Sequence, residues 1–282
     1  MGEVISGKII AEEIRGELKR TIEEAKNKGY RVPCLVTILV GNDGGSIYYL
    51  NNQRKLCEKL GLESKAIFLE ENVKEEELID LIKKLNEDKT VDGIMLQLPL
   101  PKGFNEALIT NSISPKKDVD GLTDYNNGKF YKGQEAFVPC TPRSVLHLIK
   151  STGIDIKGKN AVVIGRSNIV GKPVSQLLLN ENATITICHS RTQNMKEICK
   201  NADILVVAIG RPHFVDDSFV KEGAIVIDVG TSSVDGKITG DVDFEKVINK
   251  AGYLTPVPGG VGAVTTTLLI KNTCEAWEKN VY

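Results

Sequence analysis

The sequence is poor in the features that mark membrane, nucleic-acid-binding and secreted proteins. Aromatic residues make up 5% of its 282 residues, and no segment approaches the ~20 apolar residues of a membrane-spanning helix. The net charge is −1 and no basic block interrupts the chain, which argues against a nucleic-acid or membrane surface. Residues 1–8 lack the basic and apolar regions of a signal peptide, so we expect a cytoplasmic protein.

Cysteine and histidine are present, but not in metal-binding patterns. The six cysteines lie far apart without Cys-x-x-Cys spacing, and the three histidines do not cluster with them. A zinc site or a disulfide framework is therefore not expected. We predict buried, reduced thiols and no bound metal.

The chain is organised around a strand that runs into a glycine turn. Residues 161–164 are apolar, Gly165 follows them, and a helix is expected shortly afterwards. In a doubly wound sheet this arrangement presents backbone N–H groups and a helix N-terminus to a pyrophosphate. A plain strand-to-helix turn is the alternative, because Ser167 stands where a second glycine is usual. A second strand at crossover spacing, 183–187, favours a dinucleotide site. Its candidate residues are Gly165, Arg166, Ser167 and Ile169.

The end of the second strand distinguishes NADP from NAD. An NAD site usually has Asp or Glu there, about 20 residues beyond the turn, to hold the ribose 2′-hydroxyl. Residues 188–192 contain no acid. Guanidinium groups suit phosphate, so Arg166, Ser190 and Arg191 predict a 2′-phosphate site and NADP as the cofactor. The alternative is two solvated surface arginines.

Two later strands complete the expected cofactor domain, over 204–209 and 224–229. Gly210 and Gly230 end them, where a cofactor ring can lie against bare backbone. Thr231 joins Gly210 among the candidate cofactor-binding residues. Structural turns are the alternative for both glycines.

Hydrophobic periodicity predicts an α/β fold. The first half indicates helices over 7–28, 47–60 and 73–85 and strands over 34–40, 63–69 and from 91, with Ser46 as N-cap and Gly61 as helix stop. A helix over 143–151 precedes the second α/β unit, and a last helix spans 265–279. We therefore expect two α/β domains with a cleft between them, the second a Rossmann-like doubly wound parallel sheet.

Three polar residues stand at the ends of apolar elements in the first half: Tyr49, Gln97 and Asp120. Tyr49 shares a helix face with Gln53, four residues on. A planar heterocycle with amide-like edges suits Gln and Asp as hydrogen-bond partners. Taken singly, each has a structural alternative, namely packing for Tyr49, a capped strand end for Gln97 and a turn for Asp120.

No activated nucleophile accompanies these residues. The histidines form no Ser/His/Asp set. Hydride transfer needs no nucleophile, only two rings held face to face. Beside a dinucleotide domain, the pattern predicts a dehydrogenase that acts on a small heterocyclic donor.

Several short motifs together match a known family. They are residues 5–8, Ser46 with Tyr49, 92–94 with 97–101, 117–121, 139–142, 165–171 and 256–262. On these motifs the chain resembles the methylenetetrahydrofolate dehydrogenase/cyclohydrolases over essentially its whole length.

The resemblance implies NADP-linked oxidation of 5,10-methylenetetrahydrofolate to the 5,10-methenyl cation in one-carbon metabolism. In most members the same site hydrolyses the cation to 10-formyltetrahydrofolate. The resemblance also implies a homodimer, a catalytic folate-binding domain of residues 1–138 with 266–282, and an NADP-binding Rossmann domain of residues 139–265. The implied site residues are Tyr49 lining the folate site, Asp120 holding the pterin edge, Gln97 orienting the catalytic lysine, and Pro258, Gly259 and Gly260 as further substrate contacts.

One departure from the family pattern concerns the catalytic position. The pattern Ser-x-x-Tyr-x-x-x-Lys ends here in Gln53. A desolvated lysine takes and gives a proton near neutral pH, whereas an amide cannot titrate, and such help is typically worth ~10²–10⁴-fold. We therefore expect the cyclohydrolase step to be weak or absent. Ala263 and Val264, where the family usually has proline and methionine, leave the assignment standing.

Three alternatives remain open at this stage. The first is a fully bifunctional enzyme, with water relayed through Tyr49 and Gln97. The second is an NAD-specific dehydrogenase of the same family. The third is a folate- or dinucleotide-binding module without turnover.

Overall fold

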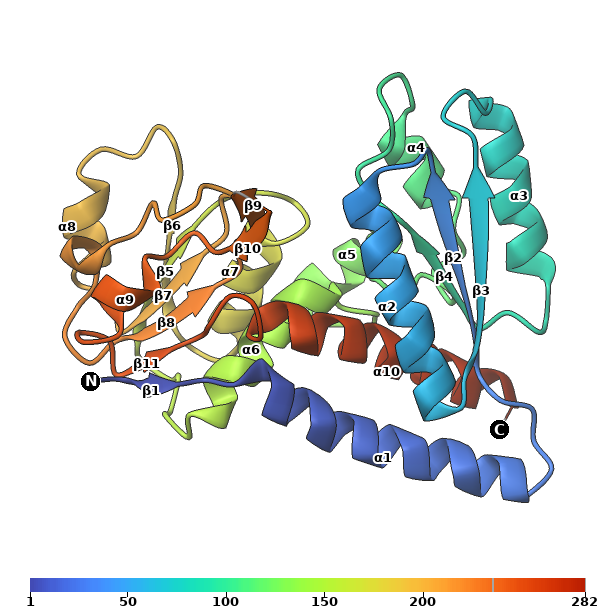
Figure 1. Ribbon diagram of the computed structural model, residues 1–282, viewed down its shortest axis with the longest axis horizontal. Helices are drawn as coiled ribbons and strands as arrows, with labels where there is room; N and C mark the ends of the chain where they lie inside the picture. Colours follow the sequence, from blue (N-terminus) through green and yellow to red (C-terminus); the bar gives the residue numbers. More distant parts are fainter. Residues whose placement is uncertain (235, 282) are drawn as a thin grey trace. The chain divides into compact units, whose positions relative to one another are not determined.

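Figure 1 shows a computed structural model, which describes residues 1–234 and 236–281. The chain divides into two compact units. One comprises residues 14–138 and the chain from 266 onward, and the other comprises residues 1–13 and 139–265. We call them the three-stranded unit and the six-stranded unit, after the main sheet of each. Both are α/β structures, which confirms the predicted fold class.

The sheet of the three-stranded unit is parallel. β2 (Cys34–Val40) lies between β3 (Glu63–Leu69) and β4 (Gly93–Leu96). Every residue of β2 is buried, which explains its unbroken apolar sequence. In this register Thr37 of β2 stands beside Met95 of β4.

Helices connect and cover these strands. They are α2 (Gly44–Leu60), α3 (Glu75–Glu87), α4 (Glu106–Asn111) and α5 (Asp124–Tyr131), with parts of α1 (Gly7–Asn27) and α10 (Val261–Val281), inside which the unit boundaries fall. The fully buried Trp277 of α10 donates from Nε1 to the Arg31 carbonyl at 3.0 Å. The last helix is thereby anchored next to the start of β2.

The start of α2 differs from the prediction. The Asp43 carboxylate accepts a hydrogen bond from the backbone N–H of Ser46 at 2.8 Å, so Asp43 is the N-cap and the prediction of Ser46 is wrong. The helix begins earlier because the capping oxygen lies three residues before the amide that it binds. Gly61, with φ +87°, ends the helix as predicted.

The six-stranded unit has one parallel sheet of order β1-β11-β8-β7-β5-β6. Its strands are β1 (Glu3–Val4), β5 (Asn160–Ile164), β6 (Thr184–Cys188), β7 (Ile204–Val207), β8 (Ile225–Asp228) and β11 (Tyr253–Leu254). The chain leaves β5 toward β6 on one side and later returns to β7 on the other. The gap between β5 and β7 is therefore a topological switch point, where open α/β sheets bind ligands.

Further elements complete this unit. They are α6 (Cys140–Ser151), α7 (Gly171–Asn180), α8 (Met195–Cys199), a 3₁₀ turn (Asp217–Phe219), α9 (Phe244–Val247) and the antiparallel pair β9 (Ser232–Val234) and β10 (Lys237–Thr239). A buried apolar cluster from β5, β7 and β8 packs beneath α8 and α9. The Rossmann-like sheet is thus present as predicted.

Residues 1–13 are located differently from the predicted domain division. That division assigns them to the folate domain, whereas in the structure they pack in the six-stranded unit, because β1 pairs with β11. All six cysteines are buried free thiols, as predicted. Within residues 1–234 and 236–281, no helix combines the length and apolarity that crossing a membrane requires.

Candidate functional site

The turn between β5 and α7 is closely packed in the six-stranded unit. Gly165 has φ +129°, and a Cβ there would overlap the carbonyl oxygen of Ala208, just beyond β7. A Cβ on Gly171, the first residue of α7, would overlap the Gly165 carbonyl. Both positions therefore require glycine, one so that the turn can approach β7 and one so that α7 can approach the turn.

Ser167 takes part in the same turn through its side chain. Its hydroxyl accepts hydrogen bonds from the backbone N–H groups of Val170 and Gly171 at 3.2 and 3.3 Å. A second glycine could not supply this cap, which satisfies amides at the start of α7. Arg166 and Ile169 are exposed beside it, so the turn offers a guanidinium group to solvent.

The loop after β6 carries the other candidate phosphate contacts. His189 accepts from the Arg191 N–H on Nδ1 at 3.1 Å, and its own N–H donates to Thr192 Oγ1 at 2.8 Å. This tight turn leaves Ser190 and Arg191 exposed. The carboxyl end of β6 thus offers a hydroxyl and a guanidinium group.

The remaining predicted cofactor residues follow β7 and β8. Gly210, with φ +64°, and Thr231 are both exposed. Because the strands are parallel, all the predicted cofactor residues lie at the carboxyl edge of one sheet. The ends of β5 and β7 border its switch point.

Gln53 of α2 points into the interior of the three-stranded unit. Its side chain is fully buried. Thr37 Oγ1 of β2 donates to Gln53 Oε1 at 2.7 Å, and Gln53 Nε2 donates to the Met95 sulfur of β4 at 3.1 Å. Both ends of the amide are therefore engaged by the sheet.

Tyr49 and Gln97 lie near the carboxyl ends of the same strands. Tyr49 stands one helical turn before Gln53, half-buried, and its hydroxyl accepts from Thr266 Oγ1 at 3.4 Å. Gln97 directly follows β4 and donates from Nε2 to the Leu98 carbonyl at 3.1 Å. Its Oε1 is buried and has no hydrogen-bond partner among the described residues. A buried acceptor without a partner costs free energy in the absence of a ligand. Gln97 Oε1 is therefore a candidate to accept a hydrogen bond from a donor group of the ligand.

A buried carboxylate organises the loop that carries Asp120. Asp118 is 2% exposed and accepts from the backbone N–H groups of Leu122 and Thr123 and from Asn126 Nδ2 at 3.0, 2.9 and 2.8 Å. Burial raises the pKa of Asp118, and these hydrogen bonds oppose the shift. This cluster is not predicted from the sequence, although Thr123, the N-cap of α5, signals a helix start there.

The other substrate candidates belong to the six-stranded unit. Residues 258–260 precede α10, and Gly259 has φ +108°, which only glycine adopts readily. Tyr49, Gln53, Gln97 and Asp120 belong to the three-stranded unit. The predicted folate contacts are thus divided between the two units.

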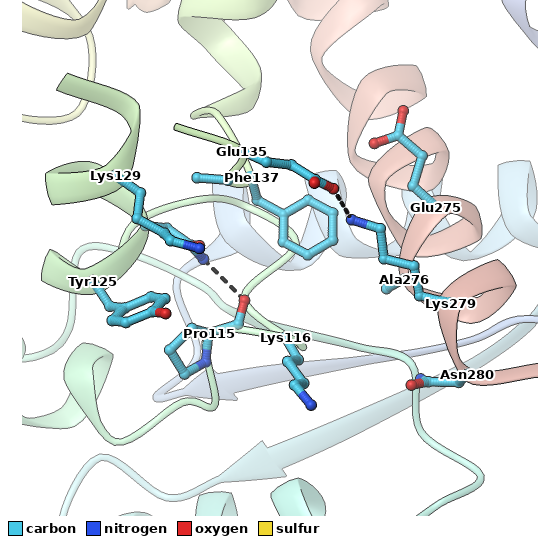
Figure 2. Close-up of a pocket in the computed structure, with 12 residues that line it drawn as sticks. Pro115, Lys116, Tyr125, Lys129, Glu135, Phe137, Glu275, Ala276, Lys279 and Asn280 are labelled. Carbon is cyan, nitrogen blue, oxygen red and sulfur yellow. Dashed lines mark hydrogen bonds and ion pairs between the residues drawn. The ribbon is translucent and has the colours of Figure 1, made fainter. Parts of the chain in front are cut away.

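A separate cavity of about 500 Å³ lies in the three-stranded unit (Figure 2). The Phe137 ring faces it, and the Lys279 ammonium and the Glu135 carboxylate pair across one side at 2.5 Å. Asn126 Nδ2 donates to the Pro115 carbonyl at 3.0 Å on another side. None of the predicted site residues lines this cavity, so we do not assign it to the site.

Comparisons with known proteins cover almost the entire chain. The family model described as the tetrahydrofolate dehydrogenase/cyclohydrolase catalytic domain matches residues 5–120. The model described as the NAD(P)-binding domain of the same family matches residues 139–281. The bifunctional protein FolD of Clostridium acetobutylicum is 62% identical over 276 residues, which are 98% of this chain and 99% of that protein.

Solved structures agree with the sequence matches. The bifunctional enzyme FolD of Campylobacter jejuni superposes with a TM-score of 0.97 at 43% identity, covering 100% of both chains. The Trypanosoma brucei enzyme, solved with NADP cofactor and an inhibitor, superposes with a TM-score of 0.94 at 37% identity, covering 99% of this chain and 98% of that one. The chain belongs to the tetrahydrofolate dehydrogenase/cyclohydrolase family.

Proposed function

We propose that the protein is an NADP-dependent methylenetetrahydrofolate dehydrogenase of one-carbon metabolism whose cyclohydrolase activity is weak or absent. Membership in the family supports the dehydrogenase activity. The relative with bound NADP supports the cofactor. The buried Gln53 amide, which cannot titrate, supports the loss of cyclohydrolase activity.

The residues of the six-stranded unit fit NADP. Gly165 and Gly171 let the turn pack against β7 and α7 against the turn, which sets the N-terminus of α7 where a pyrophosphate can bind. Arg166 and Arg191 are exposed, and residues 188–192 at the end of β6 contain no acid that would repel a 2′-phosphate. When bound there, NADP would supply the hydride acceptor for oxidation of the methylene bridge of the folate.

The proposed folate contacts orient the donor and need not move a proton. Loss of hydride from the methylene carbon leaves the methenyl cation directly. Gln97 offers its orphaned Oε1 to a donor on the substrate. Asp120, on the loop held by Asp118, would bind the pterin edge, and Tyr49 would line the site. Oxidation is therefore expected to survive without a titratable group at position 53.

Hydrolysis of the cation does need proton transfer, and the buried Gln53 amide is the observation that carries this part of the proposal. Water must add to the cation and lose a proton, which an amide cannot accept. The amide is also held by Thr37 and Met95. The buried Lys117 ammonium is engaged elsewhere, because it donates to the Leu85 and Asp88 carbonyls at 2.8 and 2.6 Å.

The second candidate is a fully bifunctional enzyme. The names of the clostridial relatives favour it, since proteins at 62% identity are called bifunctional. In this case water would reach the cation through Tyr49 and Gln97. The two candidates differ in one measurable step, the enzyme-dependent decay of the methenyl product.

The test follows methenyl absorbance after the enzyme has oxidised methylenetetrahydrofolate with NADP. We expect methenyl product to accumulate and to decay at the rate seen without enzyme. Gln53→Lys should raise the decay rate by about a hundredfold or more, and Gln53→Met, which is similar in size but cannot titrate, should not. Decay by the unchanged enzyme as fast as the dehydrogenase reaction would establish the bifunctional candidate.

Three further parts of the proposal have direct tests. Initial rates with NADP and NAD at equal concentration should favour NADP, and a preference for NAD would overturn the role of Arg166 and Arg191. Any steady turnover eliminates a non-catalytic binding module. Sedimentation should give the mass of a homodimer, and cell fractionation should recover the protein in the cytoplasm.

A further inference from the structure

A buried carboxylate outside the predicted site holds the segment that follows β7. Asp241 lies between β10 and α9 and is completely buried. Its Oδ2 accepts from the backbone N–H groups of Ile209 and Gly210 at 2.8 and 3.0 Å, and its Oδ1 accepts from the N–H of Arg211 at 2.6 Å. Three consecutive amides thus converge on one carboxylate.

A second buried carboxylate holds the first in place. Asp228, at the end of β8, accepts from the backbone N–H groups of Gly230, Asp241 and Val242, each at 2.9 Å. A Cβ on Gly230 would overlap the Asp241 side chain, and a Cβ on Gly240 would overlap Asp228. The chain therefore has no room for a side chain at positions 230 and 240, next to the two carboxylates.

Burying these two carboxylates costs more free energy than a purely structural role would explain. Neither Asp228 nor Asp241 has an ion-pair partner among the described residues, so each depends on backbone N–H groups alone. Burying a charge without a cation is costly, and an apolar pair would usually serve stability as well. What three amides on one carboxylate do supply is a fixed backbone conformation for the segment 209–211.

Residues 209–211 lie where a fixed backbone conformation can help to bind a ligand. This segment follows β7, and the turn after β5 lies against Ala208, so the two loops border the switch point of the sheet. The proposed 2′-phosphate contacts follow β6, on the other side of β5. A dinucleotide whose adenosine half lies toward β6 and whose pyrophosphate lies over the β5 turn extends its nicotinamide half toward β7.

We propose that Asp241 is a positioning residue for the nicotinamide half of the dinucleotide, acting through the backbone of residues 209–211, and that Asp228 positions Asp241. This rests on the proposed function, because it takes the bound dinucleotide from it. Asp241 itself touches neither cofactor nor folate. Its role is to keep the wall of the switch point in its binding conformation before the cofactor arrives.

The test compares Asp241→Asn with Asp118→Asn, a matched change in the other unit. Asn keeps the shape of Asp but turns an NH₂ group toward backbone N–H donors in both cases. For Asp241→Asn we expect the Kd and KM for NADP and for NAD to rise by the same factor, about tenfold or more, with the KM for folate within about twofold. For Asp118→Asn we expect the KM for folate to rise and the dinucleotide constants to stay. Arg191→Ala should weaken NADP alone.

The outcomes separate this role from simple destabilisation and from failure of the proposed function. Partial unfolding would lower kcat through the active fraction and leave both KM values unchanged, and that result, or unchanged dinucleotide constants in a folded variant, overturns the proposal. If the unchanged enzyme shows no turnover, the proposed function fails, while dinucleotide Kd values from calorimetry still test Asp241.

Hydrogen exchange of the unchanged enzyme gives a test that does not depend on any variant folding. The amides of Ile209, Gly210 and Arg211 should already be protected without NADP, because Asp241 accepts from all three. Protection that arises only when NADP is added would mean that the cofactor orders the segment, and this would overturn the proposal.

Discussion

Beside β4 in one unit and beyond the carboxyl end of β7 in the other, a buried carboxylate binds backbone amides of its own chain. Asp118 binds two backbone amides and the Asn126 side chain, and so shapes the loop that carries Asp120. Asp241 binds three backbone amides and so shapes residues 209–211. In both places the buried carboxylate binds its own chain, and it arranges a segment that we propose to face a ligand.

The two units differ in the functional groups that their candidate site residues offer. In the six-stranded unit the guanidinium groups of Arg166 and Arg191 are exposed. In the three-stranded unit the side chain at position 53, which carries the proton in the family pattern, is an amide bound to Thr37 and Met95. On the roles proposed above, dinucleotide binding and proton transfer can be lost separately, because residues of different units supply them.

Among the substitutions that test this difference between the units, Gly165→Ala is expected to have the largest effect on NADP binding and stability. The new Cβ would overlap the Ala208 carbonyl at a φ of +129°, so β5 and β7 must separate. We expect the NADP Kd to rise at least about a hundredfold and the free energy of unfolding to fall by about 3 kcal/mol. Calorimetry and urea denaturation measure the two quantities.

Gly16→Ala is the matched control for Gly165→Ala. Gly16 lies inside α1, and no atom stands within 4 Å of where its Cβ would be. We expect NADP binding to be unchanged and stability to rise by up to about 1 kcal/mol. A Gly165→Ala variant that binds NADP as well as this control would show that the turn does not hold the cofactor.

Long, periodic elements of both units could be predicted from the sequence. The buried strands 34–40 and 161–164 and the predicted helices 7–28, 47–60 and 143–151 appear at nearly the predicted bounds. Short elements without an apolar pattern could not be predicted. α5 contains two asparagines and a glycine and has no clear apolar stripe, and β1 and β11 pair two residues each across 250 positions of sequence.

The candidate site divides in the same way. Residues that follow buried strands, such as Gly165 and Gln97, could be proposed as site residues from the sequence because the carboxyl ends of parallel strands meet at one edge. Asp118 and Asp241 could not be found, because their function depends on which backbone amides the fold brings to them. A lone aspartate in a polar loop is indistinguishable from a solvated one until those amides are located.

An effect of intermediate size is expected on the pH dependence of the stability of the six-stranded unit. Burial, reinforced by the charge of Asp241, raises the pKa of Asp228 from 3.8 to about 6, against the opposing effect of its three hydrogen bonds. The folded state therefore binds more protons than the unfolded state between these values. Stability from this group is complete below about pH 4 and is lost as the pH rises through 6, by about 3 kcal/mol in all.

Asp228→Asn isolates that contribution. The variant is less stable at every pH, but the difference between the two free energies of unfolding should shrink as the pH rises from 4 to 6 and stay constant above 7. His213 borders the same small cavity as Asp228, so the two proteins are also compared in a His213→Gln background. A difference that is flat from pH 4 to 7 would contradict the raised pKa.

The smallest effect on stability is expected from Thr37→Val. This substitution tests whether Thr37 holds the Gln53 amide in place. Valine removes the hydroxyl that donates to Gln53 Oε1 and keeps the shape of the buried side chain. We expect the free energy of unfolding to fall by about 1–2 kcal/mol, since a buried acceptor loses its partner. In a Gln53→Leu background the same change should cost about 1 kcal/mol less, because no acceptor remains to be orphaned. Additive costs would mean that the amide is not held by Thr37. It would then be free to turn toward substrate, and the sharp contrast between the two units would disappear.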